Sequence, residues 1–144
     1  MGEKLVSYAS GMVKSTLDAT DIKASSDKYR VMFLSSYSMN DDACKLELTG
    51  IREALPEDKF EVDYEFMDTR RFNTDYDMSI LYRFLRNKLY RLPQFDCFIA
   101  GDDAALSFFM ERSDIFGDIP VVYFGVQDPS LVKAAEKHSN ITGI

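Results

Sequence analysis

The chain of 144 residues has no tryptophan, a single histidine and only two cysteines. Two cysteines are too few for a disulfide-stapled fold, and the spacing of Cys44 and Cys97 does not match that of a zinc site. Cys97 falls within an apolar run, where we expect it to act as a small buried hydrophobe. Because His138 is the only imidazole, it is the only histidine that could act as the base of a Ser-His-Asp type of triad. We therefore expect no metal centre and no triad-type hydrolase.

Glycine-rich phosphate-binding loops are also absent. Neither GxGxxG nor a Walker A motif occurs, and the segment Ser35–Asp42, which follows the first predicted strand, contains no glycine. Such loops bring backbone N–H groups close to a nucleotide's phosphates at the start of a helix. We expect no dinucleotide or P-loop site, and we predict no cofactor.

Long apolar runs and an excess of positive charge are lacking as well. No run is long enough to span a membrane, and the N-terminus has no signal-peptide apolar region. The chain is expected to be cytosolic or to lack a targeting segment of its parent protein. With 17 basic and 24 acidic residues its net charge is −7 at pH 7. Nucleic acids and anionic membranes require a basic face, so we expect neither as a partner.

What the sequence contains is a regular alternation of short apolar runs and helix-length amphipathic segments. Apolar runs bounded by Gly, Pro and Asp are typical of strands buried on both faces of a parallel sheet. Phe60–Phe66 differs, because apolar and acidic residues alternate strictly along it, which indicates an edge strand. The predicted strands are Tyr29–Ser35, Phe60–Phe66, Phe95–Ala100 and Ile119–Phe124.

This alternation predicts an α/β fold with a doubly wound, mostly parallel sheet. With Phe60–Phe66 at an edge, the strand order becomes 2-1-3-4, and the chain reverses direction between strands one and three. The segment Asn140–Ile144 predicts the beginning of a possible fifth strand. Ligands of such sheets bind at the carboxyl ends of the strands, at the point of reversal.

The helical segments carry both start signals and apolar stripes. Short polar side chains favour the N-cap, and apolar residues three to four positions apart indicate the face that packs on the sheet. The expected N-caps are Ser38 or Asn40, then Thr74 in a capping box with Asp77, then Asp103 for a helix over 104–112, and finally Asp128 ahead of Pro129. The expected stripes are Ala43, Leu46, Gly50, Ile51, Ala54 and Leu55 in the first helix, and Tyr76, Ile80, Leu81, Phe84, Leu85 and Leu89 in the second.

Residues 1–27 are expected to form an amphipathic helix and a linker outside the main domain, which comprises residues 28–144. Apolar residues recur at helical spacing over residues 3–18. Such a helix packs on its own domain or, alternatively, joins two copies into a homodimer.

Polar side chains are concentrated just after the predicted strands. Ser35 and Ser36 either offer hydroxyl and N–H groups to an anion or simply cap the following helix. The aspartates offer carboxylates to a ligand's ammonium group, or to Mg²⁺ or Ca²⁺, although we assign Asp128 to helix capping. Tyr37 and Met67, with Phe124 and Gln127, would line the apolar part of a pocket. The candidate site residues by position are Ser35, Ser36, Tyr37, Met67, Asp68, Asp102, Asp103, Gln127 and Asp128.

A receiver-like or metal-dependent enzyme is the alternative from a different functional class. A response-regulator receiver has an aspartate at the end of its third strand, where Asp102 stands. It also requires an acidic pair at the end of its first strand, where this chain has Ser35 and Ser36. Since no convincing nucleophile, base or lysine lies nearby, we predict a non-enzymatic protein.

Four segments between residues 29 and 144 occur in a familiar order. They are LSSYSMNDDACKLELTGIREAL, YEFMDTRRF, FDCFIAGDDAALSFFMERSDIFGDIPVVYFGVQDP and NITGI. Together they resemble the periplasmic-binding-protein-like ABC substrate-binding family. The resemblance is strongest to the version that serves as an extracytoplasmic sensor in bacterial histidine kinases and diguanylate cyclases.

The resemblance implies the first of two lobes of a type I periplasmic-binding-protein fold, which close on a ligand. It adds Gly125 to the ligand-facing positions. It implies a sensory lobe outside the cytoplasm, in a membrane-anchored signalling protein, that recognises a small molecule such as an amino acid. Asp102 or Asp103 would hold the cationic group of this ligand, and Ser36 with loop N–H groups its anionic group. A solute-binding component of an ABC transporter is the alternative.

One departure from the family pattern concerns the ligand. Relatives often have an aromatic residue, commonly tryptophan, shortly after the SY motif, where this chain has Met39 and Asn40. We therefore do not expect a stacking contact from this loop. Because half of the binding surface would belong to the second lobe, we also expect this lobe alone to bind its ligand weakly.

Overall fold

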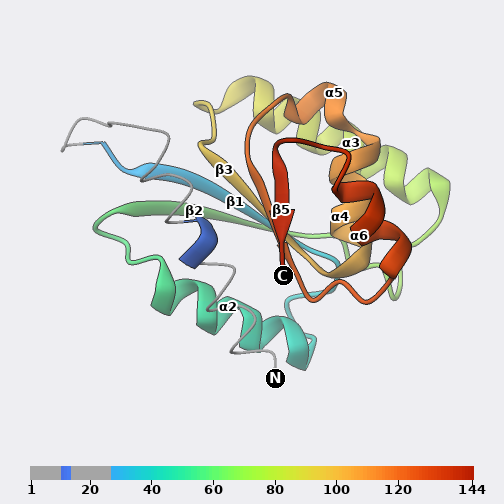
Figure 1. Cartoon of the computed structure of the whole chain (residues 1–144), viewed down its shortest axis with the longest axis horizontal. Helices are drawn as coiled ribbons and strands as arrows, with labels where there is room; N and C mark the ends of the chain where they lie inside the picture. The colour runs from blue at the N-terminus through green and yellow to red at the C-terminus, as the bar shows by residue number, and fades with distance from the viewer. Residues whose placement is uncertain (1–10, 14–26) are drawn as a thin grey trace.

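The computed structural model describes residues 11–13 and 27–144 and centres on one sheet of five parallel strands (Figure 1). The strand order is β2-β1-β3-β4-β5, so the predicted α/β class, edge position and fifth strand are confirmed. The strands are β1 (Tyr29–Ser35), β2 (Phe60–Phe66), β3 (Cys97–Gly101), β4 (Val121–Phe124) and β5 (Ile141–Gly143).

Two strands begin two residues later than predicted. Before β3, the Arg30 N–H donates to the Asp96 carboxylate at 2.7 Å, so a side chain takes the place of a backbone carbonyl as its acceptor. Before β4, Pro120 has no N–H to donate, and regular pairing begins at Val121. Both shifts lie at the amino ends of the strands, away from the predicted site.

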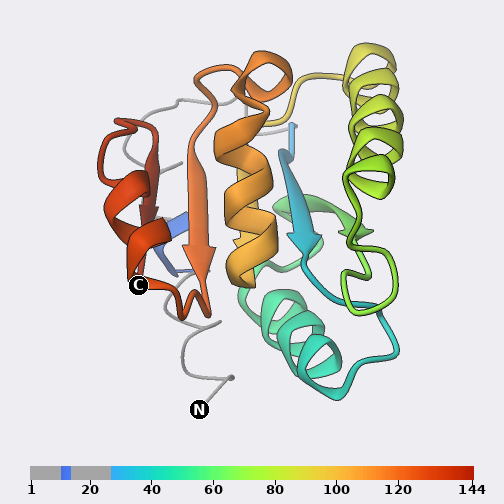
Figure 2. The ribbon, with the colours of Figure 1, turned by 90° about the vertical axis from the view of Figure 1, so that its right-hand side faces the viewer.

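Helices cover both faces of the sheet (Figures 1 and 2). One face carries α2, and the other carries α3, α4, α5 and α6. The helices are α2 (Asp42–Ala54), α3 (Asp75–Arg91), α4 (Asp102–Glu111), α5 (Ser113–Phe116) and α6 (Pro129–Ala135).

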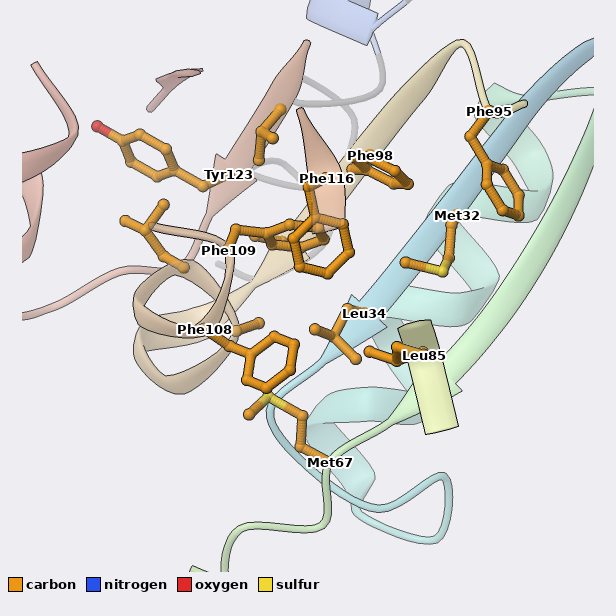
Figure 3. Packing of buried hydrophobic residues seen from close by; sticks show 14 of the residues in the cluster. Met32, Leu34, Met67, Leu85, Phe95, Phe98, Phe108, Phe109, Phe116 and Tyr123 are labelled. Atoms are coloured by element: carbon orange, nitrogen blue, oxygen red, sulfur yellow. The ribbon is translucent and has the colours of Figure 1, made fainter. Parts of the chain in front are cut away.

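Each face of the sheet has its own hydrophobic core. Under α2, the strands contribute Phe33 and Ile99, which pack with Ile51 of the helix. On the other face, Met32 and Leu34 lie opposite Leu85 of α3, and the aromatic rings of α4 and α5 cluster beside them (Figure 3). The strands in the middle are buried on both sides, which explains their unbroken apolar runs.

The edge strand β2 shows the predicted alternation. Its apolar residues, beginning with Phe60, pack toward α2. Its acidic residues point to the opposite face, where Lys88 of α3 forms an ion pair with Glu65 and Arg30 of β1 forms one with Glu61 at 3.2 Å. The charged face is therefore partly covered by basic side chains rather than left to solvent.

Two predicted N-caps are confirmed and two are wrong. The capping box of Thr74 and the Asp128–Pro129 start occur as expected. In α2 the cap is Asp41, which accepts the Ala43 N–H at 3.0 Å, rather than Ser38 or Asn40. The α4 helix begins at Asp102 with Gly101 as its N-cap, so the expected capping role of Asp103 is wrong.

The predicted apolar stripes are only half correct. In α2, Ala43 and Leu46 face solvent, while Cys44, Glu47 and Leu48 are buried in their place. In α3, Leu85 is buried as expected, but the expected Tyr76, Ile80 and Phe84 are exposed, and Met78 and Tyr82 pack against the core instead. The apolar residues of α3 span two neighbouring faces, and only one face reaches the sheet.

The predicted N-terminal helix over residues 3–18 and its linker lie mostly outside the described residues. Residues 11–13 are helical, and the Val13 side chain is fully buried against the core under α2. Both cysteines are buried free thiols, and burial raises the pKa of Cys97 to about 12, as expected for a structural residue. Within the described part of the chain, no helix combines the length and apolarity needed to cross a membrane.

Candidate functional site

Ser36, the residue just after β1, joins the loops at the carboxyl ends of three strands. Its hydroxyl donates to the Gly101 carbonyl at 2.7 Å and accepts the Ala105 N–H at 2.9 Å. Its own carbonyl accepts the hydroxyl of Thr69, beyond β2, at 2.8 Å. A hydroxyl has one hydrogen to donate, and this one is already used. Ser36 therefore organises the predicted point of reversal, and its side chain would contact an anion only by giving up a buried bond.

Removal of this hydroxyl should destabilise the protein measurably. In Ser36→Ala the Ala105 N–H is left buried without a partner, which costs about 2 kcal/mol. Urea unfolding followed by circular dichroism should show a lower midpoint with an unchanged slope. The control is Ser38→Ala, which removes one exposed hydrogen bond from Asn40 and should change stability by less than about 0.5 kcal/mol. Equal midpoints for the two variants would contradict this role.

Asp102 and Gly125 meet at the carboxyl ends of β3 and β4. Asp102 has a φ of 71° and Gly125 a φ of 73°, a backbone region that strains any residue with a Cβ. A Cβ on Gly125 would lie 2.5 Å from Asp102 Oδ1. A side chain at position 125 would therefore collide with the Asp102 carboxylate. Backbone strain such as that of Asp102 often marks a functional position.

Glu47 of α2 lies against Asp102, and sequence analysis missed it. The Glu47 side chain is 6% exposed, and Glu47 Oε2 and Asp102 Oδ2 are both buried without a conventional donor. Burial, reinforced by a hydrogen bond with Asp102, raises the pKa of Glu47 from 4.5 to about 9. Burial likewise raises the pKa of Asp102. A single proton held between the two carboxyl groups satisfies both oxygens, so the pair carries one negative charge at neutral pH.

The other three aspartates are engaged in local hydrogen bonds. Asp103 accepts the backbone N–H of Gln127 at 2.7 Å and so ties the loop after β3 to the loop after β4. Asp128 accepts the N–H and hydroxyl of Ser130, which lower the pKa of its carboxyl. Asp68, with a φ of 55°, pairs with the guanidinium of Arg71. These three carboxylates therefore hold the loops in place through hydrogen bonds, in addition to carrying negative charge.

Tyr37 and Met67 line this end of the sheet from opposite sides. Met67 is buried in the core beneath α3 and α4, while the Tyr37 ring is half-buried. The Arg70 guanidinium lies 4.8 Å from the Tyr37 ring centre and 3.2 Å from an Asp41 oxygen. Arg70 is a second residue that sequence analysis missed, and it supplies a cation beside Tyr37 and Asp41.

Two large apolar side chains are exposed in the same loops. Met39, after β1, is 56% exposed, and Phe72, after β2, is 51% exposed. The Met39 position is where relatives often carry an aromatic residue. Phe72 is an aromatic side chain available at the same end of the sheet, and its place in a loop gives no periodic signal from which sequence analysis would have found it.

The predicted residues lie in or next to the four loops that follow β1 to β4, at the end of the sheet to which the strands point (Figure 2). Ser35, Ser36 and Met67 are buried there. A separate groove of ≈ 580 Å³ lies between α3 and α5, lined by Arg86, Tyr90 and Ile115 among others, and includes none of the predicted residues. Among residues 11–13 and 27–144, no three Cys, His, Asp or Glu side chains are grouped to hold a metal ion.

The five-stranded parallel sheet in this order, with helices on both faces, is the fold of one lobe of a solute-binding protein. A crystal structure from Mycobacterium smegmatis superposes with a TM-score of 0.69 and 16% identity, covering 97% of this chain and 45% of that chain. An ABC transporter solute-binding protein from Burkholderia multivorans, with an unknown ligand represented as α-D-erythrofuranose, has a TM-score of 0.63 and 12% identity, covering 98% and 46%.

A third solved structure, also from Mycobacterium smegmatis, contains β-D-fucofuranose and has a TM-score of 0.61 and 16% identity, covering 85% of this chain and 38% of that chain. This chain therefore spans less than half the length of each of these structures. No family model matches the sequence, and no curated protein matches it. The predicted lobe architecture is confirmed at the level of the fold.

Proposed function

We propose that the chain is the ligand-binding lobe of an extracytoplasmic small-molecule sensor, non-enzymatic, whose second lobe completes the site. The observation that carries this proposal is the match of almost the whole chain to less than half of an ABC transporter solute-binding protein, the share expected of one lobe. The polar surface at the strand ends is where ligands of open α/β sheets bind. The sensor context, with a membrane-anchored parent protein, rests on the resemblance of the four sequence segments.

The chemistry of the surface favours a ligand with a cationic group, such as an amino acid. The Glu47–Asp102 pair retains one negative charge, and Arg70, which contacts Tyr37 and pairs with Asp41, would meet a carboxylate. Binding of such a ligand would stabilise the closed arrangement of the two lobes and so shift the population of the signalling state.

A sugar-binding component of an ABC transporter is the second candidate. One of the similar structures contains β-D-fucofuranose, and another, described as an ABC transporter solute-binding protein, contains an unknown ligand represented as a furanose. Carboxylates also accept hydrogen bonds from sugar hydroxyls. The two candidates differ in whether the ligand carries charge, and this difference is measurable.

A catalytic role is less well supported than binding. Asp68, Asp103 and Asp128 already accept hydrogen bonds or ion pairs within their own loops. Asp102 is held by Glu47 in a strained conformation. These arrangements suit a fixed binding surface, whereas a receiver would need its acidic groups free to hold a metal ion and accept a phosphoryl group.

The test is a titration of the ¹⁵N-labelled chain with amino acids, pentoses and hexoses at millimolar concentrations. We expect chemical-shift changes in the loops after β1 to β4 and weak binding, because this lobe supplies half of the contacts. Changes confined to the groove between α3 and α5 would refute the proposed site. Submicromolar affinity would refute the requirement for a second lobe.

A matched pair of variants separates the two ligand classes. Asp102→Asn combined with Glu47→Gln keeps the shape but removes both carboxyl groups of the pair and so its charge, and should weaken an amino acid at least about tenfold and a neutral sugar much less. Asp58→Asn, an exposed change before β2 at the opposite end of the sheet, should affect neither. Equal weakening of both ligands by the Asp102→Asn, Glu47→Gln double variant would exclude a role for the charge.

A further inference from the structure

The carboxyl groups of Glu47 and Asp102 meet in surroundings that favour only one negative charge between them. Glu47 Oε2 and Asp102 Oδ2 are both buried, and no N–H or O–H donor among the described residues reaches either oxygen. A Cβ on Gly101 would lie 2.9 Å from the Phe33 ring and 3.4 Å from Glu47 Oε2, so this carboxyl lies beside an aromatic ring of the core. Two ionised carboxylates in such a place would repel each other without water to screen them. The contact is therefore stable in the free protein only with a proton between the two groups.

The other titratable groups around the pair do not take the place of this proton. They come from α2, from the loops after β1 and β2, and from α4, and they are Asp41, Cys44, Tyr37, Arg70 and Asp103. Burial raises the pKa of Asp102, and the two neighbouring carboxylates add to this effect. Burial also raises the pKa of the phenol and of the thiol, which stay neutral. Arg70, the one cation of this set, pairs with Asp41 at 3.2 Å.

Asp102 is the member of the pair that a ligand can reach. It is half-buried, whereas Glu47 is 6% exposed. Gly125 lies beside it in the loop after β4, where a Cβ would stand 2.5 Å from Asp102 Oδ1, so no side chain at this position covers the oxygen. A cationic group placed against Asp102 attracts both carboxyl groups when they are ionised. It thus supplies the positive charge that the proton supplies in the free protein.

We propose that binding at this surface is coupled to proton release, because the cationic group of the ligand takes the place of the proton that Glu47 and Asp102 share. The inference rests on the proposed function, since it concerns the same surface. In the exchange one cation is bound and one proton passes to solvent, which leaves two negative charges opposite the ligand. By linkage, binding strengthens as the pH rises toward the pKa of Glu47 in the free protein, about 9, and no longer depends on this proton above it.

The test is an NMR titration of the ¹⁵N,¹³C-labelled chain with methylammonium chloride at pH 6 and pH 8, against sodium chloride at the same ionic strength. Methylammonium should bind at least about threefold more tightly at pH 8 than at pH 6. At pH 8 its addition should also move the carboxyl ¹³C resonance of Glu47 toward the position of an ionised carboxylate. Equal affinity at the two pH values, or a Glu47 resonance that stays in place, would overturn the proposal.

Glu47→Gln separates proton exchange from the general effect of pH on a charged surface. Glutamine has no proton to release, so the affinity of this variant for methylammonium should be the same at pH 6 and pH 8. Glu53→Gln, an exposed change on the same helix, is the matched control and should keep the pH dependence of the parent. A dependence that survives in Glu47→Gln would overturn the proposal.

The same titration distinguishes failure of the exchange from failure of the proposed function. Methylammonium that contacts the loops after β1 to β4 equally well at both pH values would leave the proposed function standing and remove only the proton exchange. Absence of such contacts at both pH values would overturn the cationic ligand class, and the proton exchange with it.

Discussion

Replacing Gly125 with alanine should destabilise the protein by about 3 kcal/mol or more. The added Cβ would lie 2.5 Å from the Asp102 carboxylate, and the backbone φ of 73° is already unfavourable for alanine. Asp102 cannot easily turn away, because its own φ is positive and its other oxygen is buried against Glu47. Urea unfolding should therefore show a large fall in the midpoint.

Gly117→Ala is the matched control for this prediction. Gly117 also has a positive φ, 62°, but nothing lies within 4 Å of its added Cβ. It should lose only the backbone contribution, about 1–3 kcal/mol, and so remain more stable than Gly125→Ala. Equal losses in the two variants would show that the contact between Gly125 and Asp102 adds nothing. The difference in the free energy of unfolding between the two variants measures how much the close contact between the loops after β3 and β4 contributes.

Replacing Glu47 with glutamine should stabilise the protein at pH 7 by about 3 kcal/mol. Glutamine has the same shape and can donate to Asp102, but it needs no proton from solvent. The pKa of Glu47 is 4.5 in the unfolded chain and about 9 in the folded one. Below pH 4.5 the Glu47 side chain is protonated in both the folded and the unfolded state, so the shared proton contributes fully to the stability of the folded protein. As the pH rises toward 9 the unfolded state releases the proton first, so the native protein loses stability.

The measurement is thermal or urea unfolding at several pH values from 5 to 9. The parent should become less stable with rising pH, and Glu47→Gln should flatten this dependence, so the two curves converge near pH 5. Glu53→Gln, an exposed change on the same helix, should leave the dependence as it is in the parent. A constant offset between parent and Glu47→Gln at all pH values would contradict a shared proton.

Much of the fold could be predicted because periodicity and burial agree along the strands. The strict alternation of Phe60–Phe66 indicated an edge strand, and the edge fixed the order of the others. The capping box at Thr74 and the helix start at Asp128–Pro129 could also be predicted, because each is formed by hydrogen bonds between residues that are close in the sequence. The prediction that the loops after the strands lie close together is also correct, because the carboxyl ends of parallel strands lie at the same end of the sheet.

The parts that sequence analysis missed depend on contacts between distant segments. Glu47 stands between Leu46 and Leu48, and a charged residue in a helix normally faces solvent. Only the fold shows that Leu46 is exposed and Glu47 lies over Asp102. In α3 the apolar residues occupy two faces, and periodicity alone does not say which one the sheet takes. The N-cap of α2 was misplaced because several short polar residues precede it.

The bonds of Ser36 have a consequence for the entropy of recognition. Ser36 connects the segments after β1, β2 and β3 through its hydroxyl and its carbonyl, so their amides should exchange with deuterium slowly, at rates close to those of the sheet. A surface held in this way has little conformational freedom left to lose. A molecule that binds there meets donors and acceptors already in position, and its selectivity follows from fit rather than from remodelling of the loops.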